Sequence, residues 1–599
     1  MRKVVVMVNP DSIPPAIETR SLRDADESPV FSPLDIEIAE WIRSDFGSAG
    51  SPWNDLLGLA AACINKAVRD GHTCLDISRP PAFLQNLAGI TWPDAGTWAE
   101  ALKPFLAHPD QPEPLPIVYE PPHHAFLHTF WKAENDLVNR FRGEATLPFQ
   151  PQAPGIPDWI TAIPSQGQRE AIQAPFSHPI VILNGGPGTG KTWTILRSIR
   201  AILERNPDAV IRIAAPTGKA VARVTESIRN GLPSLQVDPA LMERIPTEAS
   251  TIHRLVHELE STDPDRNWIP GLPSRIDWLI LDEASMIDLK LIHHLLSLLP
   301  PHSKLMLVGD VHQLSSVQPG AVFADIHAAV SRTPAAHGRP VSITLKDTFR
   351  YASDSPLHQL CEAIRCGDIQ GILDTLQKPD PSIQWISPSG PNSKCSSALD
   401  TWMEEHILPH ALALTPDEAI RRLDHALCIA ATHEGPFGVR NLNARISRKI
   451  RETASASSGI AWEPLMITRN TPNMSVYNGD MGVRRLQLPF SFEPNANCWF
   501  PGYPDGLRTI PSSRIPETIS AHAITIHKSQ GSEADHVCVL LPDAPSPLLT
   551  RELLYTAASR AKKTLMLIAT PEALQSASGN PTSRHTRLLD RLQKALINW

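Results

Sequence analysis

The run of residues most suited to phosphate chemistry lies near the middle of the chain. It reads Gly185-Gly186-Pro187-Gly188-Thr189-Gly190-Lys191-Thr192 and satisfies the P-loop pattern. An apolar run at 180–183 precedes it and a helical pattern follows. Glycines let backbone N–H groups approach a β-phosphate, and the start of the helix adds its dipole. We therefore expect Lys191 to reach the β- and γ-phosphates and Thr192 to bind Mg²⁺ through its hydroxyl. The alternative, a glycine-rich turn with a chance Lys-Thr, does not account for the order of strand, loop and helix.

A pair of acids follows the apolar run 278–281. Carboxylates at the end of a buried strand are costly unless something compensates their charge. Asp282 fits a partner for Mg²⁺, and Glu283 fits a base that orients or deprotonates an attacking water. A solvated strand end is the alternative for this pair alone. Together with the P-loop, the pair predicts binding or hydrolysis of a nucleoside triphosphate.

Three further polar residues are candidates for the same site. Gln313 follows the apolar run 305–308, where its side chain would lie close enough to sense a γ-phosphate. Arg350 and Arg560 lie farther along the chain, and each could act as an arginine finger from a second domain. Such an arginine accelerates hydrolysis by about 10³–10⁵-fold. Taken singly, each arginine is more often part of a surface ion pair.

Two series of short apolar runs must position these residues. The first covers 180–183, 211–215, 278–281 and 305–308, and the second covers 343–345, 426–430, 523–526, 537–541 and 564–568. Short strands that alternate with helices indicate parallel sheets covered on both faces. The sequence therefore predicts two tandem α/β domains.

Local composition predicts the remaining domain boundaries. We place a mainly helical N-terminal domain at 1–150, with helices at 56–69 and 126–141, because proline-rich stretches interrupt regular structure at 104–122 and 148–164. The first α/β domain is expected at 160–339 and the second at 340–474 and 517–599. Residues 475–516, rich in Gly, Pro and Asn, are expected to form a small β insertion.

The overall composition excludes several classes of protein. Hydrophobic residues make up 42% of the 599, too many for a disordered chain, and no run approaches the ~20 apolar residues of a membrane span. The eight cysteines show no metal-binding spacing, so a reduced, cytoplasmic protein fits best. The first 150 residues hold 12 basic and 20 acidic side chains, which accounts for the whole net charge of −8. An acidic N-terminal block is suited to protein contacts rather than to gripping DNA.

The order of the motifs resembles that of superfamily 1 helicases. Besides the P-loop, the strings that carry the likeness are Ala215-Pro216-Thr217-Gly218-Lys219-Ala220, Ser250-Thr251-Ile252-His253-Arg254-Leu255, Asp282-Glu283-Ala284-Ser285-Met286-Ile287-Asp288, and Gly309-Asp310 with Gln313-Leu314. Three others resemble the RecD family, the α subunits of exodeoxyribonuclease V. They are Glu434-Gly435-Pro436-Phe437-Gly438-Val439, Tyr477-Asn478-Gly479-Asp480-Met481-Gly482 and Thr525-Ile526-His527-Lys528-Ser529-Gln530-Gly531-Ser532-Glu533. The likeness covers 165–599 well and 50–150 weakly.

This resemblance implies two RecA-like motor domains with ATP between them and single-stranded DNA across their top. It further implies 5′-to-3′ translocation, an SH3-like fold for 475–516, and a strand-separating pin near 258–275, which is short here. Gln168 would contact adenine. The residues implied to line the DNA track are Thr217, Lys219, Thr251, His253, Thr525, His527 and Ser529.

The resemblance also implies partners. The chain would act with β and γ subunits in a helicase–nuclease that repairs double-strand breaks by homologous recombination, with the nuclease on the β subunit. No acidic cluster in this sequence resembles a nuclease centre, so we expect no DNA cleavage by this chain. Two alternatives stay open: a stand-alone helicase of the same kind, and an assembly or regulatory ATPase subunit.

Overall fold

A computed structural model gives the fold. It describes residues 30–597 except 48–50, 52, 85–91, 108–114, 146–154, 262–274, 335, 353, 389–394, 457–460, 470, 472–473, 475, 487–496, 502–505 and 516. The centre of the expected pin and much of the expected β insertion therefore lie outside the described residues. Among the helices it describes, none is both long enough and apolar enough to cross a bilayer.

A six-stranded parallel sheet forms the first α/β domain, in the order β6-β5-β7-β8-β4-β9. Its strands are β4 (Ile180–Gly185), β5 (Ile211–Ala215), β6 (Ser250–Thr251), β7 (Trp278–Leu281), β8 (Lys304–Gly309) and β9 (Val341–Leu345). The helices of this domain are α6 (Gln166–Gln173), α7 (Lys191–Arg205), α8 (Gly218–Gly231), α10 (Ile252–Glu260), α11 (Leu289–Leu298) and α12 (Val322–Ser331). Strands β4 and β7 are buried throughout, because apolar cores lie on both faces of the sheet. The predicted parallel, doubly covered sheet is confirmed.

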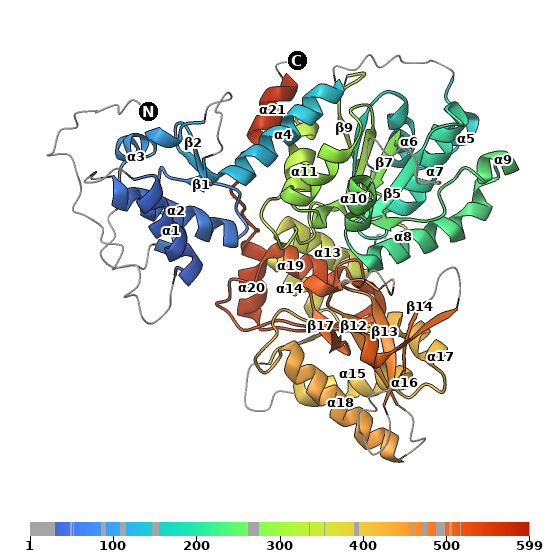
Figure 1. Ribbon diagram of the computed structural model, residues 1–599. Helices are drawn as coiled ribbons and strands as arrows, with labels where there is room; N and C mark the ends of the chain where they lie inside the picture. Colours follow the sequence, from blue (N-terminus) through green and yellow to red (C-terminus); the bar gives the residue numbers. More distant parts are fainter. Residues whose placement is uncertain are drawn as a thin grey trace.

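A five-stranded parallel sheet forms the second α/β domain, in the order β10-β19-β18-β11-β17. Its strands are β10 (Ile383–Ile386), β11 (Ala426–Ala430), β17 (Ala523–Thr525), β18 (Ala534–Leu540) and β19 (Ala561–Ile568). One core includes helices α13 (Pro356–Cys366), α14 (Ile369–Gln377), α19 (Arg551–Ala558) and α20 (Pro571–Gly579). Another includes α15 (Cys395–His406), α16 (Leu408–Ala411) and α18 (Val439–Ala456). Figure 1 shows this domain below the first.

A separate antiparallel sheet is inserted into the second domain, in the order β15-β14-β13-β12-β16. Its strands are β12 (Ala461–Ile467), β13 (Met481–Leu486), β14 (Asn497–Pro501), β15 (Leu507–Pro511) and β16 (Thr518–Ser520). The expected limits of 475–516 were too narrow, because β12 and β16 pair with each other and belong to this sheet. Short helix α17 (Pro416–Arg421) packs against it.

Strand β9 corrects a second boundary. The sequence analysis assigned the run 343–345 to the second domain. In the structure, β9 pairs in parallel with β4, and Leu183 lies opposite Ile343, so the first domain extends at least to Leu345. The strand completes the edge of the first sheet before the chain crosses to the second domain.

The N-terminal region combines helices with a small sheet. Its elements are α1 (Pro33–Asp45), α2 (Asn54–Arg69), β1 (Leu75–Asp76), α3 (Ala95–Ala101), β2 (Ile117–Glu120) and β3 (His124–Leu127). A capping box between Ser32 and Asp35 begins α1, and an apolar core of its own holds the region together. The three strands form an antiparallel sheet that the sequence analysis did not predict.

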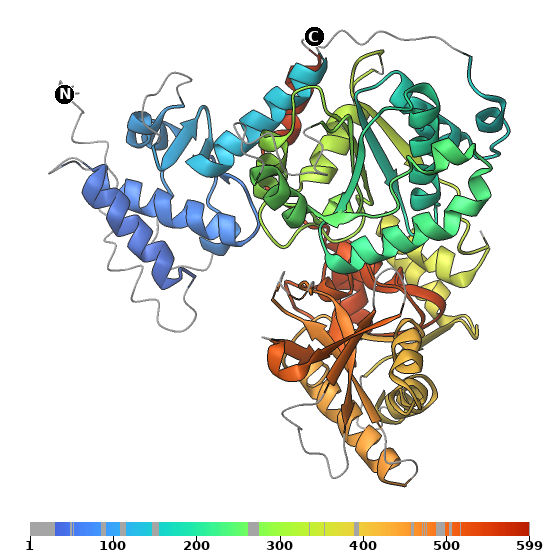
Figure 2. The ribbon, with the colours of Figure 1, turned by 45° about the vertical axis from the view of Figure 1, so that its right-hand side comes forward.

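Two helices far apart in sequence join the first domain. Helix α4 (His128–Ala145) was expected within the N-terminal domain, and α21 (Leu588–Ile597) within the second α/β domain. Both belong instead to the core of the first domain, through residues such as Phe141 and Leu592. Figures 1 and 2 show them side by side, between the N-terminal region and the first sheet.

Candidate nucleotide site between two parallel sheets

The glycine-rich loop joins β4 directly to α7. Gly188 and Gly190 adopt φ of 78° and 79°, a left-handed conformation that costs glycine little. A Cβ on Gly188 would lie 2.3 Å from Cβ of Arg350, and one on Gly190 would lie 2.7 Å from Nε2 of Gln168. Gly190 is the N-cap of α7 and brings no side chain, so the first amides of the helix are open to an anion.

The side chains predicted to bind nucleotide gather around this loop. The Lys191 ammonium donates to the carbonyls of Gly185 at 2.7 Å and Gly186 at 3.2 Å. Thr189 also donates to Gly186, at 2.9 Å. Buried Gln168 on α6 donates through Nε2 to the carbonyl of Thr189 at 3.3 Å. Pro187 and Thr192 are half-buried in the loop and at the start of α7. The structure therefore brings the whole predicted set together.

The acidic pair lies at the end of β7, beside the loop. Asp282 is 8% exposed, and its carboxylate accepts a hydrogen bond from the backbone N–H of Glu283 at 2.9 Å. Burial, followed by the charge of Glu283, raises the pKa of Asp282 to about 6, although Lys191 opposes the shift. Glu283 has φ of 51°, a left-handed conformation that is rare outside glycine and recurs at functional sites. Two adjacent carboxylates whose negative charges are largely uncompensated are suited to binding a divalent cation.

A chain of hydrogen bonds links the first sheet to the second domain. After β8, Gln313 donates to Asp310 at 3.1 Å, and Asp310 also accepts from the Tyr555 hydroxyl of α19 at 3.2 Å. Gln313 in turn accepts from Nη2 of Arg560 at 2.9 Å. The residue predicted to sense a γ-phosphate therefore contacts one of the predicted arginine fingers of the other domain.

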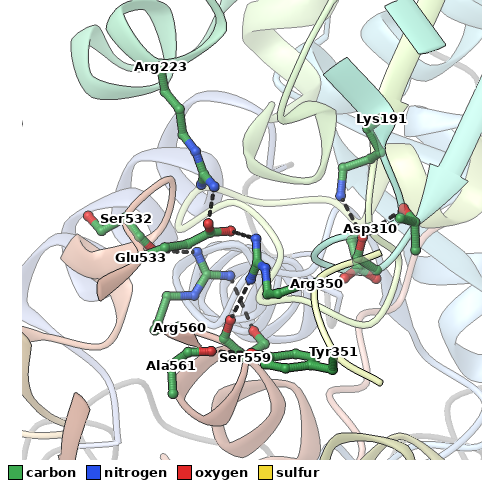
Figure 3. Close-up of polar contacts among 12 residues, drawn as sticks. Lys191, Arg223, Asp310, Arg350, Tyr351, Ser532, Glu533, Ser559, Arg560 and Ala561 are labelled. Carbon is green, nitrogen blue, oxygen red and sulfur yellow. Dashed lines mark hydrogen bonds and ion pairs between the residues drawn. The ribbon is translucent and has the colours of Figure 1, made fainter. Parts of the chain in front are cut away.

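The Glu533 side chain interacts with arginines from both domains (Figure 3). Its carboxylate forms ion pairs with Arg350 and with Arg223 of α8. Burial alone would raise the pKa of Glu533, but the charges of Arg223, Arg350 and Arg560 outweigh it and lower the pKa to about 2. Arg350 also donates to the carbonyl of Ser559 at 3.3 Å.

Arg560 is held by the backbone as well as by Gln313. It is 2% exposed and donates to the carbonyls of Thr556 at 2.9 Å and Ser532 at 3.0 Å. Burial lowers its pKa, while the charges of Glu533 and Glu283 act in the opposite direction. Arg560 thus lies within electrostatic reach of the acidic pair on the first sheet. Both predicted arginines are therefore in this one network.

The predicted DNA-contacting hydroxyls have partners within the protein. Thr217, Thr251 and Thr525 each accept from a backbone amide in the turn that follows, at 3.2–3.3 Å. Buried Ser529 donates to the carbonyl of Ile526 at 2.7 Å. These hydrogen bonds shape the loops at the carboxyl ends of β5, β6 and β17. Contacts of the four hydroxyl residues with DNA stay predictions.

The other predicted DNA-contacting residues differ in exposure. His253 is exposed, whereas Lys219 and His527 are half-buried. Burial lowers the pKa of both half-buried side chains, favouring the neutral forms. The loop before β13 also approaches this region, because a Cβ on Gly218 would lie 2.3 Å from Oδ1 of Asp480.

Four residues of the network, Asp310, Tyr555, Glu533 and Arg223, had no predicted role. Asp310 and Glu533 lie inside strings that carried the family resemblance, which was a usable signal. Arg223 gave no such signal, because an arginine one turn after Lys219 is a common residue on a helix surface. Its partner lies 310 positions away in sequence and became apparent only when the two domains were placed together.

A P-loop on one parallel sheet, facing arginines from a second, defines a RecA-like P-loop fold of the helicase type. Family models match in three places: an AAA domain at 164–385, a UvrD-like helicase C-terminal domain at 520–568, and the RecBCD enzyme subunit RecD N-terminal domain at 27–120. The RecBCD enzyme subunit RecD of Mycobacterium tuberculosis is 30% identical over 96% of this chain and 98% of its own length. The chain belongs to the family of RecBCD enzyme subunit RecD.

Two other similar proteins differ more. The ATP-dependent RecD2 DNA helicase of Deinococcus radiodurans is 26% identical over 77% of this chain and only 58% of its own length. A crystal structure of Pif1 helicase from Bacteroides, with ADP-AlF3 and single-stranded DNA, has a TM-score of 0.39 at 15% identity. The structural match covers 73% of this chain and 98% of the Pif1 chain.

Proposed function

We propose that this chain is an ATP-driven DNA motor that moves 5′ to 3′ on single-stranded DNA as the α subunit of a RecBCD-type helicase–nuclease. One observation carries the proposal. Residues of the first domain, Lys191 and the Asp282–Glu283 pair, share one polar network with arginines that follow the first sheet and belong to the second domain. A site divided between two domains couples nucleotide state to their relative position, which is what a motor requires.

Each residue has a role that follows from its position. Lys191 and the amides of residues 186–190 would bind the phosphates of ATP, and Thr192 with Asp282 would hold Mg²⁺. Bound Mg²⁺ neutralises phosphate charge. Glu283 would orient and deprotonate the attacking water, while Arg350 and Arg560 would stabilise charge on the transferred phosphoryl group. Gln313, held between Asp310 and Arg560, would report the γ-phosphate to the second domain.

The base of the nucleotide has candidate neighbours as well. Gln168 lies against the loop, and Phe349 is 64% exposed although its backbone N–H donates to the carbonyl of Gly188 at 2.8 Å. An exposed aromatic ring anchored at a phosphate loop offers an apolar face for stacking. We assign adenine recognition to these two side chains.

DNA would cross the carboxyl ends of the strands, where Thr217, Lys219, Thr251, His253, Thr525, His527 and Ser529 lie. Hydroxyls and amides bind phosphates without reading bases, as a motor indifferent to sequence needs. We further propose that the antiparallel sheet of 461–520 is the SH3-like insertion of the family, and that the short pin near 258–275 leaves strand separation partly to partners.

The choice between a complex subunit and a stand-alone helicase rests on how much of each relative's length this chain matches. The chain covers 98% of the Mycobacterium tuberculosis RecD subunit but 58% of RecD2. We therefore favour a cytoplasmic heterotrimer with β and γ subunits, acting in the repair of double-strand breaks by homologous recombination, with DNA cleavage left to the β subunit. The N-terminal region would contact those partners. A regulatory subunit alone would not need both arginines beside a complete phosphate site.

The decisive experiment is strand displacement by the purified chain with ATP and Mg²⁺, on duplexes that carry a 5′ or a 3′ single-stranded tail. We expect activity only from the 5′ tail, or DNA-stimulated ATP hydrolysis that yields unwinding only when the β and γ subunits are added. Lys191→Gln should abolish hydrolysis and leave the fold intact. Unwinding from the 3′ tail would contradict the proposed polarity, and normal turnover by Lys191→Gln would overturn the site.

A further inference from the structure

Three histidines of the second α/β domain meet on the side of its sheet that faces α15. His406 is the last residue of α15, His425 directly precedes β11, and His536 lies in β18. One ring nitrogen from each can be chosen so that all three lie within 4.8 Å of one another. In the part of the chain that the structure describes, no other three metal-ligating side chains come so close.

The backbone fixes two of these positions. Strands β11 and β18 are parallel neighbours, with Ala426 opposite His536. The backbone N–H of His536 donates to the carbonyl of His425 at 3.0 Å. The rings of these two residues have centroids 4.8 Å apart at an angle of 71°. Ligands carried by paired strands are held more accurately than ligands on loops.

The third ring comes from the end of a helix. The centroids of His406 and His536 are 4.1 Å apart and nearly parallel, and those of His406 and His425 are 6.5 Å apart. His406 thus extends the pair into a three-sided group that joins a helix to the sheet. Three imidazoles from three separate elements are what a tetrahedral metal site uses, with a fourth position for water or a carboxylate.

One ring has a hydrogen-bonded outer partner. The hydroxyl of Thr564 lies 2.8 Å from Nδ1 of His536, and such a partner sets ring orientation in metal-bound histidines. Two carboxylates lie farther away: Oδ2 of Asp535 is 3.5 Å from Nδ1 of His425, and Glu405 is 3.8 Å from His406. Lys563 binds Asp535 at 2.8 Å.

We propose that His406, His425 and His536 bind Zn²⁺. Metal–nitrogen distances of 2.0–2.1 Å in a tetrahedral site place the nitrogens about 3.4 Å apart. Because the rings of His406 and His536 are stacked at 17°, closing the group to that distance requires these rings to turn until their nitrogen lone pairs converge. Three nitrogen ligands suit Zn²⁺ and disfavour Mg²⁺, which takes oxygen ligands and keeps its water. The site is thus chemically distinct from the proposed Mg²⁺ position at Asp282.

The location suggests what the metal would do. His536 lies three residues after Glu533, which holds Arg350 and Arg223. A metal that joins α15 to the amino ends of β11 and β18 would stiffen the segment that positions Glu533. Because it binds only the folded chain, it would also stabilise the second domain.

The test measures metal binding directly on the full chain. The protein is freed of metal with a chelator, dialysed into excess MgCl2, and titrated with ZnCl2 by calorimetry while thermal unfolding is followed in parallel. We expect one Zn²⁺ per chain, a rise in Tm of several degrees, and a visible absorption band when Co²⁺ replaces Zn²⁺. Failure of the protein to take up Zn²⁺ would overturn the proposal.

Variants locate the metal. His425→Ala removes the most exposed ligand, and His406→Gln removes a second without entering the sheet. Each should weaken Zn²⁺ binding at least tenfold and abolish both the Tm shift and the Co²⁺ band. His294→Ala is the matched control, because His294 pairs with Glu260 on the first domain and should bind Zn²⁺ as the parent does. Equal binding by parent, His425→Ala and His406→Gln would place the metal elsewhere and refute the assignment.

Discussion

At the scale of single residues, Glu533 joins the two α/β domains through ion pairs. Its side chain is 7% exposed and pairs with one arginine from α8 and one from the segment after β9. Since its pKa is lowered to about 2, its ionised form contributes stability above the ordinary value near 4.5, and that contribution is lost as pH falls from there towards 2.

Replacing this carboxylate tests that dependence. Glu533→Gln keeps the shape but removes the charge, so Arg223, Arg350 and Arg560 face one another without compensation. We expect the free energy of unfolding to fall by about 3–5 kcal/mol and DNA-stimulated ATP turnover to fall by about 10²-fold through misplaced arginines. Urea denaturation and steady-state hydrolysis measure both. The control is Glu572→Gln, an exposed acid on α20. Parent-like turnover in Glu533→Gln would show that the arginines do not need it.

If Asp282 holds Mg²⁺ as proposed, its raised pKa would make Mg²⁺ binding dependent on pH. Its pKa is raised from 3.8 to about 6, so between pH 4 and 6 the folded chain holds a proton that the unfolded chain has lost. Stability attributable to this group therefore decreases as pH rises through that window, and a bound cation competes with the proton. We expect affinity for Mg²⁺ with ADP to weaken by about tenfold per pH unit below 6. Mg²⁺ titrations from pH 5 to 8 measure it. Asp282→Asn should lose both affinity and the pH dependence, whereas exposed Asp543→Asn should keep both.

Sequence reasoning located the chemical groups better than their partners. Lys191, Asp282, Glu283, Gln313, Arg350 and Arg560 all lie in the predicted site, because each follows a strand or lies in a string with local meaning. The pairing of Glu533 with Arg223 could not be predicted, since it depends on how two domains meet. Likewise, DNA contacts of Thr217 and Thr251 were expected from the family resemblance, and only the structure shows that their hydroxyls cap helices.

At the scale of elements, the nucleotide loop is held by the segment that enters the second domain. Gly188 accepts a hydrogen bond from the N–H of Phe349, and its Cα faces Cβ of Arg350. The loop and the arginine therefore share one contact. The loop cannot change shape without moving Arg350.

A methyl group at that contact should separate the two segments. Gly188→Ala forces a left-handed φ of 78° on a residue with a side chain and places its Cβ 2.3 Å from that of Arg350. We expect a loss of about 1–3 kcal/mol in stability and a loss of nucleotide affinity, measured by thermal unfolding and by binding of a fluorescent ATP analogue. Gly579→Ala is the matched control, because a Cβ there would meet no atom within 4 Å. Unchanged affinity in Gly188→Ala would show that the loop adapts independently of Arg350.

Strands were easier to predict than their sheets. The apolar runs at 180–183, 211–215 and 278–281 are strands of the predicted sheet. The run 343–345 was assigned to the wrong domain. The residues of β12 and β16 were placed in the second α/β domain instead of the inserted sheet, and neither was predicted to be a strand. An apolar run indicates a strand but not its neighbours, because pairing depends on where crossover connections return the chain.

At the scale of the whole molecule, helix α21 contacts the N-terminal region. Arg591 of α21 pairs with Glu134 of α4 at 3.0 Å and with Glu120 of β2. Glu134 is fully buried and also accepts from Thr73 at 2.6 Å. Burial raises its pKa although Arg591 opposes the shift. One arginine thus joins the N-terminal region to the first α/β domain across more than 450 positions in sequence, a contact that no local pattern could reveal.

Removing that arginine should loosen the N-terminal region without touching the nucleotide site. Arg591→Ala leaves Glu134 buried without its cation, and we expect a loss of about 3–5 kcal/mol at pH 8. The loss should be smaller at pH 5 than at pH 8, because a carboxyl whose pKa is raised is protonated more readily at the lower pH and then depends less on the arginine. Urea denaturation at both pH values measures the free energy, and limited proteolysis reports loosening of the N-terminal region. Lys594→Ala, an exposed change on the same helix, should alter stability by less than about 0.5 kcal/mol. An equal loss at pH 5 and pH 8 would mean that Arg591 acts through packing rather than through the charge of Glu134.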